Sequence, residues 1–185
     1  TKIHDNQNIC DIIVNKIEKI GLKSKIVVAT SSQKSDQKIV NFCKKKGLRY
    51  FLGSNKNVFH RTTQCIKKYK LKYFVRICAD RPLFDTDVMR KMIILIINKN
   101  YDIVTNVHPR TYPKGLTCEV AKTEIFKNVN QKILLKIDKE HIFNYFYRNK
   151  AHKIHNIKSK FSNNFIKKNF CIDSRKDLKK IRNIL

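Results

Sequence analysis

The stretch Arg76-Ile77-Cys78-Ala79-Asp80-Arg81-Pro82-Leu83 joins the end of an apolar run to a polar turn. The run, residues 73–77, is rich in aromatic and β-branched residues, which favours a β-strand. Asp80 and Pro82 are residue types that are common in the turn after a strand. In open α/β sheets ligands bind outside the carboxyl ends of the strands, so we expect a functional site at this turn.

Similar apolar runs alternate with longer amphipathic segments over the first 107 residues. We predict strands at 26–29, 48–52, 73–77 and 102–107, and helices at 8–20, 33–46, 58–69 and 85–99. Such alternation is typical of an α/β fold with three layers, in which a mainly parallel sheet has helices on both faces.

The alternation becomes irregular after residue 107. A loop at 108–116 precedes a predicted strand at 117–121, helices at 123–129 and 136–149, a short strand at 170–172 and a closing helix at 174–185. The Lys- and Asn-rich segment 150–168 has no clear pattern. With 185 residues in all, we predict a single domain with an α/β part (1–107), an extension (108–169) and a closing strand and helix (170–185).

The formal net charge of +27 is the strongest compositional signal in the chain. It is compatible with a polyanionic partner, and a basic nucleic-acid-binding module is one function that would follow. The lysines are spread along the whole chain, however, whereas a specific nucleic-acid footprint gathers in a patch. Ile and Asn are abundant as well, which indicates compositional drift. Nucleic acid is therefore the less favoured partner.

Cysteine spacing and hydropathy indicate a cytoplasmic protein. None of the six cysteines has CxxC spacing, so we expect buried thiols in a reducing compartment and no zinc site. No apolar run reaches 18 residues, and no signal-peptide pattern opens the chain. Neither GxGxxG nor a P-loop motif is present.

Two carboxylates follow predicted strands: Asp80 comes after 73–77, and Asp173 comes after 170–172. If these strands are parallel, both carboxylates lie at one edge of the sheet and could hold Mg²⁺, which takes one or two protein carboxylates together with substrate phosphates. Simpler roles stay open, because Asp80 suits a turn and Asp173 suits a helix N-cap. Arg76 either pairs with a carboxylate or reaches a phosphate.

Further motifs follow one another in a recognisable order. They are Lys25 to Ser31, Gly53-Ser54 with Asn57 to Arg61, Val75 to Leu83, Tyr112 to Val120, Glu140-His141, and Cys171 to Leu178. In this order they resemble the cytidylyltransferase family that includes the spore coat polysaccharide biosynthesis protein F group and, more distantly, CMP-Kdo and CMP-sialic acid synthetases. Each motif alone is modest, but together they cover nearly the whole chain.

The resemblance implies a nucleotide-diphospho-sugar transferase-like fold and Mg²⁺-dependent transfer of CMP from CTP to a sugar or sugar acid, with release of pyrophosphate, in surface polysaccharide or glycan biosynthesis. It implies that Asp80 and Asp173 hold the metal and that Arg76 acts with Asp80 in catalysis. Arg61 and Ser31 would lie on the nucleotide side. The sugar side would comprise Tyr112, Gly115, Glu119, Glu140 and His141. Synthetases of the related families are often dimers, which leaves a homodimer open.

The chain also departs from the family pattern. Family members open with a strand and a loop rich in Arg, Ser, Pro and Lys that holds the triphosphate, and the 185 residues contain no such segment. We therefore expect the sheet to lack its first strand, in a fragment of an enzyme or in a non-catalytic remnant that serves as a binding partner. Thr117 stands where the family usually has Asp, and Lys114 stands where an acidic residue is common.

Overall fold

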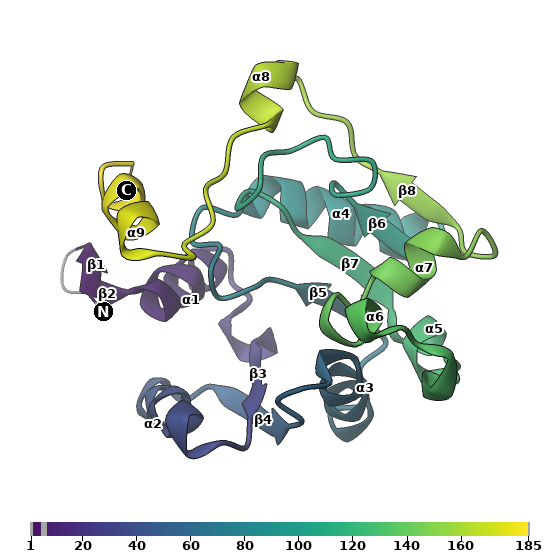
Figure 1. Cartoon of the computed structure of the whole chain (residues 1–185), viewed down its shortest axis with the longest axis horizontal. Helices are drawn as coiled ribbons and strands as arrows, with labels where there is room; N and C mark the ends of the chain where they lie inside the picture. Colours follow the sequence, from purple (N-terminus) through teal and green to yellow (C-terminus); the bar gives the residue numbers. More distant parts are fainter. Residues whose placement is uncertain (1, 5–6, 185) are drawn as a thin grey trace. The chain divides into compact units, whose positions relative to one another are not determined.

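The computed structural model describes residues 2–4 and 7–184 (Figure 1). The chain forms two compact units. The first unit comprises Thr1–Gly21, Phe74–Ala121 and Lys153–Leu185, and the second comprises Leu22–Tyr73 and Lys122–His152. The predicted α/β class is confirmed, since helices accompany both parallel and mixed sheets. The prediction of a single domain stays a prediction.

A four-stranded mixed sheet forms the centre of the first unit. Its order is β5 (Tyr73–Arg76), β7 (Glu119–Lys122), β6 (Ile103–Thr105) and β8 (Ile154–Asn156). Strand β6 pairs antiparallel with β7 and parallel with β8. All three residues of β6 are fully buried, and helix α4 (Thr86–Asn98) packs against this strand with Met92 and Ile96 in the core. Asp85 caps α4 with its side chain, which accepts from the Asp87 and Val88 amides.

Shorter elements complete the first unit. The antiparallel pair β1 (Lys2–His4) and β2 (Gln7–Asn8) leads into α1 (Ile9–Lys19), whose N-terminus is capped by the Asn8 side chain. Toward the end of the chain lie α8 (Asn163–Ile166) and α9 (Arg175–Arg182). Strand β8 and helix α8 thus fall within the segment that the sequence left unassigned.

The second unit begins with the parallel pair β3 (Val27–Ser31) and β4 (Arg49–Gly53). Helices α2 (Gln37–Lys46) and α3 (Val58–Lys68) pack against this pair (Figure 1). Short helices α5 (Thr123–Lys127), α6 (Lys136–Glu140) and α7 (Asn144–Arg148) follow. Their core is aromatic: the Phe126 ring lies 5.3 Å from that of Phe59 and 4.5 Å from that of Phe146, between centroids.

Two predictions of secondary structure are wrong. The predicted helix 136–149 is broken between α6 and α7, because Arg148 returns to donate two hydrogen bonds of 2.6–2.7 Å to Asp138. In a continuous helix these residues would be about 15 Å apart along the axis. The predicted strand 170–172 is irregular, because the Phe170 and Ile172 amides bond to two separate turns and the Cys171 amide bonds to the Asn169 side chain.

The helices are short or carry many charged residues. Among residues 2–4 and 7–184, no helix combines the length and the hydropathy that crossing a bilayer requires.

Candidate active site

The turn that carries Asp80 follows β5 in the first unit. The Arg81 amide donates to the Cys78 carbonyl at 3.1 Å and closes the turn, while 34% of the Asp80 side chain stays exposed. Lys16 of α1 holds the next residues, because its ammonium donates to the carbonyls of Phe84 at 2.6 Å and Pro82 at 3.3 Å. Burial lowers the pKa of Lys16. The turn is therefore anchored on both sides of Asp80.

Asp173 is brought to this turn by the backbone. The Ile172 amide donates to the Asp80 carbonyl at 2.9 Å, and Asp173 is the next residue. Burial and then the charge of Asp80 raise the pKa of the Cys171 thiol to about 11, with a smaller contribution from Asp173, although nearby Arg81 lowers it. The N-cap of α9 is Ser174, whose hydroxyl accepts from the Asp177 amide. Asp173 is exposed and is not the cap.

Gly115 explains how the segment before Asp173 reaches this position. Its φ is +92°, and a Cβ atom there would lie 2.4 Å from the Phe170 carbonyl carbon and 2.8 Å from the Cys171 nitrogen. The Phe170 amide donates to the Lys114 carbonyl at 2.8 Å. Glycine is needed because the two backbones touch. This packing accounts for Gly115 without a substrate.

Arg76 and Glu119 face each other across the neighbouring strands β5 and β7. A guanidinium nitrogen of Arg76 lies 3.6 Å from a carboxylate oxygen of Glu119, and only 4% of Glu119 is exposed. Tyr112 is buried with its ring edge-on to Phe161. Burial, together with Asp85 and Cys118, raises the pKa of the Tyr112 hydroxyl. Glu119 and Tyr112 thus lie inside the first unit rather than on its surface.

The residues expected on the nucleotide side lie together in the second unit. Ser31 and Gly53 are register partners at the carboxyl ends of β3 and β4. The Arg61 side chain lies over Gly53, where a Cβ atom would meet its Cγ at 2.8 Å, and Arg61 donates to the Ser54 carbonyl at 2.9 Å. Ser31 is buried, and its amide and hydroxyl both donate to Asp36.

Glu140 and His141 are exposed residues at the end of α6, also in the second unit. Tyr112, Gly115 and Glu119 belong to the first unit, so the predicted sugar-side residues are divided between the two units.

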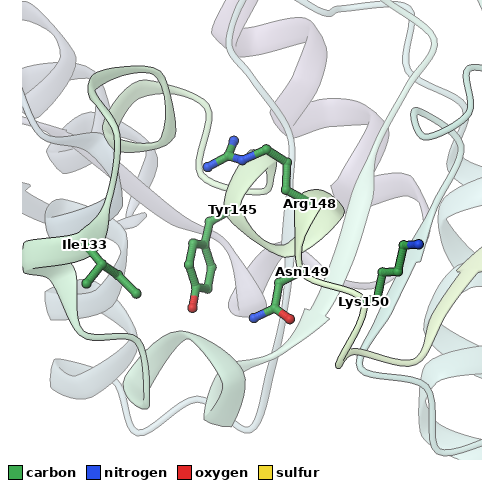
Figure 2. A pocket seen from close by; sticks show the side chains of 5 residues that line it. All are labelled: Ile133, Tyr145, Arg148, Asn149 and Lys150. Carbon is green, nitrogen blue, oxygen red and sulfur yellow. The ribbon is translucent and has the colours of Figure 1, made fainter.

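A pocket of about 340 Å³ near α7 contains none of the predicted residues. It is lined by Ile133, Tyr145, Arg148, Asn149 and Lys150. In Figure 2 the side chains of Tyr145 and Asn149 point in the same direction, and the Arg148 guanidinium points in the opposite direction.

No group of three or more His, Cys, Asp and Glu side chains within the described part of the chain could hold a metal, so Asp80 and Asp173 would have to bind one as a pair. Two carboxylates suit Mg²⁺, which takes its remaining ligands from water and phosphates. The sequence patterns did not reveal three supporting residues. Lys16 and Arg81 hold the turn that carries Asp80, and Asp36 holds Ser31.

Comparison with known proteins identifies the family. A family model described as cytidylyltransferase matches residues 5–184. An uncharacterized protein of Methanocaldococcus jannaschii is 29% identical over 141 residues, which cover 76% of this chain and 57% of that protein. The spore coat polysaccharide biosynthesis protein SpsF of Bacillus subtilis is 24% identical over 130 residues, with coverage of 68% and 53%. The chain spans a little over half the length of these curated relatives.

Solved structures show the same fold. A cytidylyltransferase from Leptospira borgpetersenii aligns with a TM-score of 0.88 at 22% identity, over 98% of this chain and 78% of that one. A CMP:2-keto-3-deoxy-manno-octonic acid synthetase complexed with CTP aligns with a TM-score of 0.66 at 10% identity, over 95% and 86%. The sequence match over nearly all residues, supported by this fold, shows that the chain belongs to the cytidylyltransferase family.

Proposed function

We propose that this chain is part of an Mg²⁺-dependent nucleotidyltransferase that transfers CMP from CTP to a hydroxyl of a sugar or sugar acid. The observation that carries the proposal is the hydrogen bond from the Ile172 amide to the Asp80 carbonyl, which sets Asp173 beside the Asp80 turn. Family membership supports it, as do the CTP complex of one structural neighbour and the polysaccharide role in the name of one relative.

Asp80 and Asp173 are the residues that would hold Mg²⁺. When bound, the ion would neutralise charge on the phosphates of CTP. Both carboxylates are reachable, because Asp173 is exposed and a third of the Asp80 side chain is exposed. Arg61, which lies over the end of β4, would bind the nucleotide with Ser31. Arg76 would act from the end of β5 as a fixed cation, with Glu119 holding its orientation.

The reaction is a substitution at phosphorus. The acceptor hydroxyl oxygen attacks the α-phosphorus of CTP, the bond to the bridging oxygen of the β-phosphate breaks, and pyrophosphate leaves while the hydroxyl proton passes to solvent. Tyr112, Gly115 and Glu119 are proposed for the acceptor side. Of these, Glu119 is engaged with Arg76 and Gly115 with Phe170, so their contribution is to shape the site. Glu140 and His141, which the family resemblance also implied for the sugar side, stay proposals of their own.

The direct test measures pyrophosphate released from CTP by the chain with Mg²⁺ and a panel of sugars and sugar acids. We expect Asp80→Ala and Asp173→Ala to lower the rate by roughly a hundredfold, the size seen when one stabilising group is lost. Asp87→Ala is the matched control, because Asp87 is an exposed acid in the first turn of α4. Full activity in Asp80→Ala would contradict the assignment of the metal site.

Binding measurements made beside this assay would support the alternatives. Binding of CTP without release of pyrophosphate would favour a non-catalytic remnant that serves as a binding partner. Tight binding to a nucleic-acid duplex at physiological salt, without binding of CTP, would favour the basic module, since non-specific charge attraction weakens steeply with salt.

A further inference from the structure

Arg81 occupies an unusual position, since it directly follows Asp80 and is largely buried. Only 21% of its side chain is exposed. One terminal nitrogen donates to the Thr117 hydroxyl at 2.9 Å, which ties the guanidinium to the segment just before β7. The backbone amide is fixed by its bond to the Cys78 carbonyl. Arg81 is therefore held at both ends and cannot swing into solvent without breaking the Thr117 bond.

The guanidinium compensates charge at Asp80 without binding its oxygen atoms. The Arg81 Nε atom lies 3.9 Å from an Asp80 carboxylate oxygen, which is within ion-pair range but too long for a hydrogen bond. This buried Nε has no hydrogen-bond partner among the residues that the structure describes. A purely structural Arg–Asp pair normally satisfies such a donor. Here the guanidinium lies beside the Asp80 carboxylate without donating a hydrogen bond to it through Nε.

A second carboxylate also acts on Arg81. Glu119 interacts electrostatically with its guanidinium and is itself paired with Arg76 at 3.6 Å. The sheet edge thus carries two fixed guanidinium groups beside the carboxylates of Asp80 and Glu119. Because arginine stays protonated at every accessible pH, the positive charge at Asp80 is permanent.

We propose that Arg81 is a positioning residue that acts as a built-in counter-ion of Asp80 and weakens the binding of divalent cations until a nucleotide is present. The proposal rests on the proposed function, in which Asp80 and Asp173 are the metal carboxylates. A doubly charged ion beside a fixed guanidinium is repelled by it. Phosphate groups that arrive with the metal would offset this repulsion, so metal binding would depend on the nucleotide.

The test measures Mn²⁺ binding to the nucleotide-free chain by the electron paramagnetic resonance signal of unbound Mn²⁺. We expect Arg81→Met to bind Mn²⁺ about tenfold more tightly than the unmodified chain, since one neighbouring positive charge is removed. Arg81→Gln, which is neutral but able to bond to Thr117, should show the same gain. Arg81→Lys keeps the charge and should stay close to the unmodified chain.

Equal or weaker Mn²⁺ binding in both neutral variants would overturn the proposal. It would also be overturned if Arg81→Met weakened binding of CTP in the presence of EDTA, because Arg81 would then be a direct nucleotide ligand. Adding Asp80→Ala to Arg81→Met separates the two proposals. If this addition leaves Mn²⁺ binding unchanged, the metal site itself is wrong. If it abolishes binding while Arg81→Met alone brings no gain, only the role of Arg81 is wrong.

Discussion

The amide of Ile172 donates a hydrogen bond of 2.9 Å to the carbonyl oxygen of Asp80. This single bond joins two turns that are far apart in the sequence and sets the residue after Ile172 beside a carboxylate. Since Phe170 is bonded in the same way to Lys114, residues 169–173 lie across two turns of the first unit. The position of Asp173 therefore depends on backbone contacts and not on a strand.

The first prediction concerns the glycine that allows this contact. Gly115→Ala should lower the free energy of unfolding by about 3 kcal/mol, because the new Cβ atom meets the Phe170 backbone and the residue keeps a positive φ. Urea denaturation measures the loss. Gly47→Ala is the matched control, since its φ is also positive but nothing lies within 4 Å of the new atom. It should lose only about 1 kcal/mol. Equal losses would show that contact with Phe170 is not the reason for glycine.

Local signals in the sequence predicted the first half of the chain well. Asn8 and Asp85 cap their helices, and Gly47 ends α2 in a left-handed conformation, with its amide bonded to the Cys43 and Lys44 carbonyls. These features depend on neighbours within a few residues, so hydropathy and capping rules detect them. The location of Asp80 at the end of a strand followed from the same rules.

Features that depend on distant partners could not be predicted in this way. The break at His141 is imposed by the Arg148–Asp138 ion pair, and the apolar pattern of residues 136–149 is helical on its own. Segment 170–172 has strand-like composition, but its hydrogen-bond partners are turns. Arg81 was overlooked because its anchor, Thr117, is distant in the sequence and lies in the segment before β7.

The second prediction concerns how Arg61 is positioned. Gly53→Ala should displace the Arg61 side chain, whose Cγ would lie 2.8 Å from the new Cβ atom. Because a flexible side chain can move, we expect a stability loss below about 1 kcal/mol. If Arg61 binds the nucleotide, affinity for CTP should fall by about tenfold, the worth of one charged hydrogen bond.

A double-mutant cycle measured by calorimetric CTP titration checks this explanation. Once Arg61→Ala has been made, Gly53→Ala should have no further effect on affinity, since the two changes act through one side chain. Additive losses would mean that Gly53 contributes to nucleotide binding by itself.

The third prediction concerns the ion pair that breaks the helix. Asp138 is fully buried, whereas 48% of the Arg148 side chain is exposed. Arg148→Met leaves a buried carboxylate without its partner and should cost about 3 kcal/mol. Asp138→Asn leaves a guanidinium that water can reach and should cost about 1 kcal/mol. Thermal unfolding of the two variants tests this order, and a larger loss in Asp138→Asn would contradict it.

The last prediction is a pH dependence at the end of β3. Hydrogen bonds from the Ser31 and Thr30 hydroxyls lower the pKa of Asp36 below its ordinary value of 3.8. A carboxylate whose pKa is lower in the folded state stabilises the fold above the unfolded pKa, and this stability is lost as the pH falls through the folded pKa. Asp36→Asn should therefore cost about 1 kcal/mol at pH 7. The difference from the unmodified chain should shrink as the pH falls below 3.8 through the lowered pKa of folded Asp36. Urea midpoints at neutral and acidic pH measure it, and a cost that is the same at both would show that the charge of Asp36 plays no part.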